Sequence, residues 1–171
     1  AAPPPLVSQR ASQSSATPLS TAKDITTTGR YGFRIFTDRD GLPQNSITSI
    51  TFDLKGYLWV GTLDGIACYN GRKWIVKKLP NRQASNYVRT LVAMSDGSLW
   101  VGTSGGLSIL KNDQWSTFDE KSGLPNNEVR AILESKAVDG SPEYWLGTDG
   151  GLVCLRNGAP VVPISADELP D

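Results

Sequence analysis

The side chains available for acid–base chemistry are restricted, because the sequence contains no histidine. Histidine is the commonest general base and a member of the usual catalytic triads. An enzyme built on this chain would have to use Asp, Glu, Lys or Tyr side chains gathered from different parts of the fold. The acids Asp53, Asp64, Asp96 and Asp149 are explained by predicted turns. We therefore expect no catalytic residue, no metal site and no cofactor in this chain.

Two arginines are candidates for binding an anion. Arg89 and Arg130 occupy the same position in successive copies of a repeat, on predicted inner strands, where the first copy has Thr48. If both side chains face a central channel, their guanidinium groups are suited to bind an anionic group. The alternative is pairing with acids on neighbouring strands, such as Glu128, and we favour this interpretation.

Amides, carboxylates and tyrosines near predicted loops form a second set of candidates. Asn45, Asn86 and Asn127 share one repeat position, where an Asn amide can fix a turn by bonding to local backbone. The alternative is that this connection and the Asp64-Gly65 hairpin share a ligand-binding rim, and a sugar site needs exposed aromatics beside such groups. The complete set of candidate ligand-binding residues is Asn45, Asp64, Tyr87, Arg89, Asn127, Arg130, Tyr144 and Asp149.

The two cysteines are expected to be buried and unpaired. Cys68 and Cys154 occupy equivalent positions in the first and third copies of the repeat, and Ile109 occupies that position in the second copy. A whole repeat therefore separates them, which exceeds the reach of a disulfide. The chain has no Cys-x-x-Cys or other metal-binding spacing.

The elements that must position these residues are set by a threefold internal repeat. Trp59, Trp100 and Trp145 are 41 and 45 residues apart, and each stands in a Trp-Val/Leu-Gly-Thr motif. A Leu-Pro pair precedes each copy, and a further one begins at Leu169. A period of this length is typical of a propeller blade. The tryptophans are expected to fill the space between neighbouring blades, and the following glycines to permit close backbone approach.

Each repeat is predicted to form four short antiparallel strands. In the first copy the alternating runs are 46–52, 57–62, 66–69 and 74–78, and Asp-Gly and Asn-Gly pairs between them suit tight hairpins. The copies differ in length at 81–85 and around 139–142. Insertions mark loops, so either segment is a candidate for carrying specificity.

These residues carry a family resemblance. The strings Gly41-Leu42-Pro43-Gln44-Asn45 and Tyr57-Leu58-Trp59-Val60-Gly61-Thr62 resemble the two-component regulator propeller repeat, and both later copies keep the Trp-Gly-Thr motif. That repeat is found in extracytoplasmic sensor regions of hybrid histidine kinases and some diguanylate cyclases. The resemblance covers the chain from about residue 31 and implies an all-β fold of β-propeller blades, each of four antiparallel strands.

The predicted domain organisation is an arm followed by an incomplete ring. Residues 1–30 are rich in Ala, Pro, Ser and Thr and are expected to form a flexible arm. Residues 31–171 are expected to form a partial propeller, with an outer strand at 31–37 and blades at about 42–79, 80–123 and 124–168. Propellers close with about four to eight blades. The missing blades are expected to come from further sequence or from another copy of the chain.

Composition and resemblance together predict the function. Lys plus Arg equals Asp plus Glu at 17 each, so no field of one sign attracts nucleic acid, and no apolar run reaches membrane-spanning length. The resemblance implies a periplasmic or extracytoplasmic, non-catalytic sensor region from a membrane-anchored bacterial receptor of the two-component or cyclic-di-GMP type. Its expected partner is a small-molecule or carbohydrate ligand. The alternatives are a protein-interaction scaffold and a propeller lyase or hydrolase.

Overall fold

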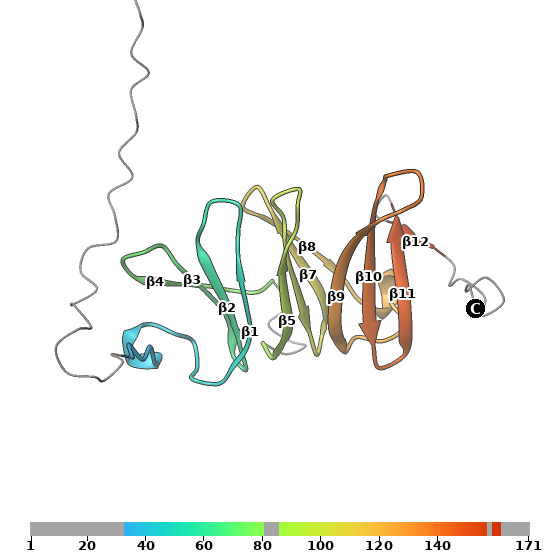
Figure 1. Cartoon of the computed structure of the whole chain (residues 1–171). Helices are drawn as coiled ribbons and strands as arrows, with labels where there is room; N and C mark the ends of the chain where they lie inside the picture. The colour runs from blue at the N-terminus through green and yellow to red at the C-terminus, as the bar shows by residue number, and fades with distance from the viewer. Residues whose placement is uncertain (1–32, 81–85, 157–158, 162–171) are drawn as a thin grey trace, which may run out of the picture. The chain divides into compact units, whose positions relative to one another are not determined.

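The computed structural model describes residues 33–80, 86–156 and 159–161, and within them the chain forms three antiparallel sheets. Each sheet has four strands in simple up-and-down order (Figure 1). The three-blade, all-β architecture predicted from the repeat is confirmed. Three sheets are fewer than the roughly four to eight with which a propeller closes.

The strands follow the repeat. The first sheet contains β1 (Ile47–Phe52), β2 (Leu58–Thr62), β3 (Gly65–Tyr69) and β4 (Trp74–Lys77). The second contains β5 (Val88–Ala93), β6 (Leu99–Thr103), β7 (Gly106–Lys111) and β8 (Gln114–Phe118). The third contains β9 (Val129–Lys136), β10 (Pro142–Thr148), β11 (Gly151–Arg156) and β12 (Ala159–Val161). All four strands predicted in the first copy are found within one residue of their expected bounds.

Short 3-10 turns precede the first and third sheets. These are η2 (Asp38–Asp40) and η3 (Glu120–Ser122), and each ends at a glycine with a left-handed backbone, Gly41 at φ 107° and Gly123 at φ 105°. Leu42 and Leu124 directly follow these glycines, whereas Leu79 follows the first sheet without such a turn. All three leucines are buried to the same extent, with 6% of the surface exposed. The repeated Leu-Pro pair therefore fixes the chain to the core just before each inner strand.

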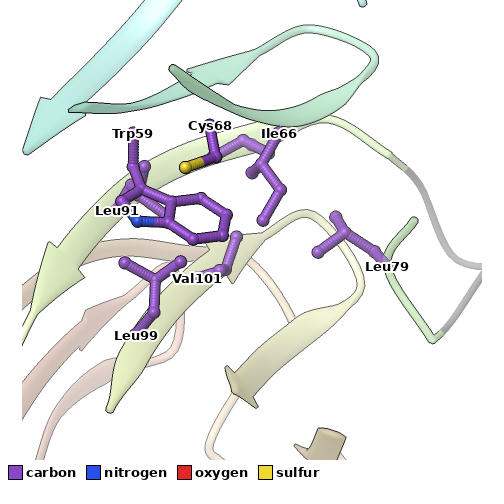
Figure 2. Close-up of a cluster of buried hydrophobic side chains, with 8 residues drawn as sticks. Trp59, Ile66, Cys68, Leu79, Leu91, Leu99 and Val101 are labelled. Carbon is purple, nitrogen blue, oxygen red and sulfur yellow. The ribbon is translucent and has the colours of Figure 1, made fainter. Parts of the chain in front are cut away.

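Neighbouring sheets pack face to face through the repeated residues. In the first cluster, Trp59, Ile66 and Cys68 of the first sheet meet Leu91, Leu99 and Val101 of the second (Figure 2). A second cluster joins Trp100 and Leu107 to Val129, Leu146 and Val153 of the third sheet. Ser49 adds a polar tie, because its hydroxyl accepts from the Leu91 N–H at 3.1 Å and donates to the Leu91 carbonyl at 3.2 Å. A third, smaller cluster of Leu42, Val60 and Ala67 lies on the first sheet, so most of the core, but not all of it, is at the two junctions.

Trp59 and Trp100 fill the junctions between neighbouring sheets, as predicted, whereas Trp145 is only partly buried and belongs to no junction among the described residues. Both cysteines are buried and unpaired, as predicted. The indole N–H groups of Trp59, Trp100 and Trp145 donate to Asp53, Ser98 and Ser135 at 2.9, 3.0 and 3.1 Å. Cys68 and Cys154 are free and buried, in β3 and β11. Burial is the main cause that raises the pKa of each thiol, so both remain protonated at neutral pH.

The amino-terminal segment departs from expectation. Residues 33–37 form no strand, although an outer strand was predicted at 31–37. A strand requires a neighbouring strand, and none of the three described sheets includes this segment. Phe36 packs instead against the rings of Tyr69 and Trp74, with centroids 5.4 and 5.6 Å apart. The proposed arm at 1–30 and the insertion at 81–85 lie outside the described residues.

Candidate functional site

The residues that the repeat places just before and within the inner strands gather at one end of the sheets. Each inner strand begins after a short connection, and the β2–β3 and β10–β11 hairpins lie beside these beginnings. Gly65 N–H donates to the Asn86 carbonyl at 2.8 Å, and Asp149 N–H donates to the Glu128 carbonyl at 3.2 Å. Backbone bonds thus hold the hairpins against the strand connections. We call the side chains that meet here the inner-strand cluster: Asp64, Asn86, Tyr87, Arg89, Glu128, Arg130 and Asp149.

Arg89 links the second and third sheets. Its Nε donates to the Glu128 carboxylate at 3.0 Å, and both side chains are 27% exposed. Its guanidinium carbon also lies 4.0 Å from the centre of the Tyr87 ring, within the range of a cation–π contact. The pairing of an inner-strand arginine with Glu128, favoured from sequence, is confirmed for Arg89.

Arg130 occupies the equivalent position in the third sheet but pairs with a different acid, Asp149. Its Nε and Nη2 both donate to the Asp149 carboxylate, the second at 2.8 Å. The hydrogen bond to Asp149 raises the pKa of Arg130, and the same bond lowers the pKa of Asp149. The charge of Arg89 also lowers the pKa of Asp149, and Glu128 and Tyr87 raise that of Arg130. The two arginine–carboxylate pairs are therefore close enough to influence each other electrostatically.

Asp64 and Asn86 extend the cluster across the first junction. The Asn86 amide donates to the Asp64 carboxylate at 2.9 Å. Both residues line a pocket of about 220 Å³ with Lys77, Lys78 and Leu79. A pocket lined by an amide and a carboxylate offers hydrogen-bond donors and acceptors to a polar ligand.

Asn45 and Asn127 have structural roles. Asn45 Oδ1 accepts from the Asp38 N–H at 2.7 Å, and Asn127 Oδ1 accepts from the Glu120 N–H at 2.9 Å. Each amide thus fixes a 3-10 turn seven residues upstream, as the local-backbone interpretation predicts. Asn86 differs, since its amide crosses to Asp64.

Tyr144 lies elsewhere, between the second and third sheets. Its ring stacks on Trp100, with centroids 4.5 Å apart and an interplanar angle of 28°. Burial is the main cause that raises its pKa, followed by the charges of Asp96 and Glu134. Of the eight sequence candidates, Tyr87 and Arg89 are in contact, as are Arg130 and Asp149, and Asp64 accepts from Asn86. Asn45, Asn127 and Tyr144 have their described contacts with other residues.

Two members of the cluster were not among the sequence candidates. Glu128 was recognised only as a pairing partner, and Asn86 only as a repeated turn residue. The repeat register held a signal for Glu128, which precedes Arg130 by two residues as the candidate Tyr87 precedes Arg89. It held none for Asn86, whose equivalents Asn45 and Asn127 bond to local backbone instead. Among the residues that the structure describes, no group of three acids or cysteines could hold a metal ion. No helix in this part of the chain is long and apolar enough to cross a membrane.

Comparison with known proteins supports the family resemblance. Residues 41–64 match the family described as two component regulator propeller. No curated protein matches the chain at a significant level. The match covers one repeat, and the two later copies extend its pattern through the described sheets.

Solved structures share the fold. The extracellular domain of a putative hybrid two component system from B. thetaiotaomicron is 27% identical, with a TM-score of 0.62, over 71% of this chain and 17% of that chain. A second such domain from the same organism is 25% identical, with a TM-score of 0.59, over 82% of this chain and 19% of that chain. Virginiamycin B lyase from Staphylococcus aureus is 20% identical, with a TM-score of 0.50, over 70% of this chain and 42% of that chain. A likeness at this level shows the fold alone. The chain thus spans less than a fifth of either extracellular domain.

Proposed function

We propose that this chain is part of the extracytoplasmic ligand-sensing propeller of a bacterial signal-transduction receptor, of the two-component or cyclic-di-GMP type. The observation that carries the proposal is its likeness to the extracellular domain of a hybrid two component system, together with the family match of its first repeat. The sensing region binds a ligand and leaves catalysis to a signalling module of the same receptor. The likeness to a lyase supports the fold and gives no reason to propose its reaction.

The inner-strand cluster is the proposed binding site. It combines an aromatic ring, an amide, carboxylates and guanidinium groups in three sets of contacts at one end of the sheets. Hydroxyl-rich ligands such as carbohydrates are bound by side chains of this kind, because carboxylates accept and guanidiniums donate paired hydrogen bonds. The side chains of the Arg130–Asp149 pair are 54% and 41% exposed, so a ligand can reach them. The hydroxyls of a small polar or carbohydrate ligand would replace part of the hydrogen bonding between Arg130 and Asp149.

Ligand binding would change the contacts between neighbouring sheets. Arg89 and Glu128 come from different sheets, as do Asp64 and Asn86. A ligand that bridges these pairs would therefore bias how adjacent sheets are held. A ligand shifts a conformational equilibrium only by its differential affinity for the two states, so contacts across a junction are suited to transmit binding.

Thermal unfolding in the presence of a panel of neutral oligosaccharides, amino acids and small organic acids tests this function. A ligand present at about 100 times its dissociation constant stabilises the folded state by roughly 2.7 kcal/mol. For a domain of this size that raises the melting temperature by several degrees. We expect at least one compound to do so, and Arg130→Met to abolish the shift.

The matched control is Arg72→Met, which removes an exposed arginine on the β3–β4 loop, away from the cluster. This variant should retain the full ligand-induced shift. If no compound raises the melting temperature, the sensing proposal fails for this part of the receptor. If the shift survives Arg130→Met, the ligand binds outside the inner-strand cluster.

A further inference from the structure

The two internal junctions differ at the end of the sheets where the inner strands finish, opposite the inner-strand cluster. At the second junction, the Tyr144 ring stacks on Trp100 with centroids 4.5 Å apart. The Glu134 carboxylate accepts from the Ser95 N–H at 2.8 Å and from the Ser95 hydroxyl at 2.5 Å. An aromatic stack and two hydrogen bonds therefore close this end of the second junction.

Smaller residues stand at the equivalent positions of the first junction. Glu134 of β9 and Tyr144 of β10 are a cross-strand pair, and the equivalent pair of β5 and β6 is Ala93 and Leu99. Leu99 lies beside the Trp59 ring (Figure 2). The methyl group of Ala93 cannot accept a hydrogen bond, and Leu99 is smaller than a tyrosine. The first junction therefore lacks both contacts that close the second.

Two adjoining pockets occupy this end of the first junction. Their volumes are about 290 and 240 Å³, and Trp59, Leu110 and Asp113 line both. Leu54 of the β1–β2 turn reaches the β5–β6 turn, because a Cβ on Gly97 would lie 3.6 Å from its Cδ1. Ligand pockets typically measure roughly 300–1,000 Å³. The space therefore suits a small ligand, which we expect to lie between the first and second sheets.

The apolar part of the lining comes from both sheets. Trp59 belongs to β2, Leu99 to β6 and Leu110 to β7. The Trp59 ring is held in place, because its indole N–H donates to Asp53 at 2.9 Å. A ring fixed beside aliphatic side chains suits the apolar body of a ligand.

The charged part of the lining is balanced, with three lysines and three aspartates. Most of these groups are engaged within the chain. Asp53 accepts from the backbone N–H groups of Lys55 and Tyr57 at 2.9 Å each. Asp96 accepts from Lys111 Nζ at 2.7 Å. These two carboxylates and Lys111 therefore have little capacity left for a ligand.

One group of each sign stays available. The Lys55 ammonium, on the β1–β2 turn, takes part in none of the ion pairs among the described residues. Asp113, on the β7–β8 turn, lies 3.6 Å from Lys77, but its side chain is 90% exposed and water screens such a pair. A cation on one sheet and a carboxylate on the next match a ligand that carries both charges.

We propose that this end of the first junction binds an apolar α-amino acid in its zwitterionic form. Lys55 donates to the carboxylate of the ligand, and Asp113 accepts from its ammonium group. The side chain of the amino acid packs against Trp59 and Leu110. The ligand thus bridges the first and second sheets, at the opposite end from the inner-strand cluster and independently of it.

Titration of the chain with L-phenylalanine, followed by nuclear magnetic resonance, tests the proposal. We expect the indole N–H signal of Trp59 and the backbone signals of the β1–β2 and β7–β8 turns to shift together and to saturate. Three compounds each lack one part of the ligand: glycine lacks the apolar body, phenethylamine the carboxylate and phenylpropionate the ammonium group. All three should lose most of the shift at the same concentration.

Two substitutions test the residues. Lys55→Met should weaken phenylalanine binding roughly fivefold, the upper range for an exposed charge pair. Leu99→Tyr gives the first junction the ring that Tyr144 supplies to the second, and it should abolish binding. The matched control is Lys121→Met, which removes an exposed lysine of η3 at the other end of the sheets and should bind as wild type. Circular dichroism verifies that each variant is folded.

The absence of a saturable shift with phenylalanine overturns the proposal. Equal binding of phenethylamine, or unchanged binding in Lys55→Met, also overturns it, because the carboxylate would then have no partner at this site. Arg130→Met should bind phenylalanine as wild type. Loss of binding in that variant would place the amino acid at the inner-strand cluster and overturn the second site, whereas failure of the sensing proposal leaves these outcomes unaffected.

Discussion

Three glycines at one position of the repeat differ in what lies above them. Gly102 is confined by Thr90, with Cγ2 2.6 Å from the place of a Cβ, and by the Val129 carbonyl at 2.7 Å. Backbone cannot move aside as a flexible side chain can. Gly147 has only an ordinary contact at 3.4 Å. The space available for a side chain at this position of the motif therefore differs between the second and third sheets.

Gly102→Ala is accordingly expected to destabilise the fold while Gly147→Ala does not. Forcing a methyl group into the second junction should lower the free energy of unfolding by about 1–3 kcal/mol. At Gly147 the change should stay within about 0.5 kcal/mol. Urea unfolding of both variants, at a concentration where the chain is monomeric, measures the difference. Equal effects would contradict the junction geometry.

At the scale of elements, the β5–β6 turn is held by a chain of polar contacts. Asp96 accepts from Ser98 N–H at 2.9 Å and from Lys111 Nζ at 2.7 Å, and the Ser98 hydroxyl accepts from the Trp100 indole at 3.0 Å. Burial opposes ionisation of Asp96, but the hydrogen bonds from Lys111 and Ser98 outweigh it and lower its pKa to about 2. The turn therefore depends on a carboxylate that stays ionised in moderate acid.

This turn predicts a specific loss of stability in acid. An unfolded Asp has a pKa of about 3.9, so the contribution of Asp96 is complete above that pH and is lost as pH falls towards 2. Asp96→Asn should lose less unfolding free energy than wild type between these limits. Lys111→Met should raise the pKa of Asp96 as measured by carboxyl NMR. An unchanged pKa in that variant would contradict the role of Lys111.

The strands could be predicted because the local signals agree with the packing. Asp-Gly and Asn-Gly turns, alternation and the repeated Trp all indicate the same four strands per sheet.

The different ion-pair partners of the two inner-strand arginines could not be predicted from local signals. Arg89 and Arg130 share a repeat position, yet one pairs across a junction with Glu128 and the other within its sheet with Asp149. The difference has two sources: the third sheet supplies Glu128 to Arg89, and the hairpin of the second sheet carries Ser104 where that of the third carries Asp149. The strand expected at 31–37 is a similar case, since pairing is a property of the assembled fold.

At the scale of the whole molecule, stability is expected to reside in completed junctions. In repeat architectures, stability is approximately a sum of terms within repeats and between neighbours. Leu91 and Ile50 occupy one repeat position, but Leu91 lies in a completed junction at 2% exposure and Ile50 on an open face at 67%. Substitutions at these two residues therefore test the same repeat position once in a buried and once in an exposed environment.

Leu91→Ala should lower the free energy of unfolding by about 2–5 kcal/mol, through lost burial and the cavity left behind. Ile50→Ala should change it by no more than about 1 kcal/mol when the chain is dilute, because its side chain is already in water. Urea unfolding of both variants beside the wild-type chain measures the two costs. Equal costs at Leu91 and Ile50 would contradict the assignment of Leu91 to a completed junction and of Ile50 to an open face, because a side chain that is already in water loses little when it is truncated.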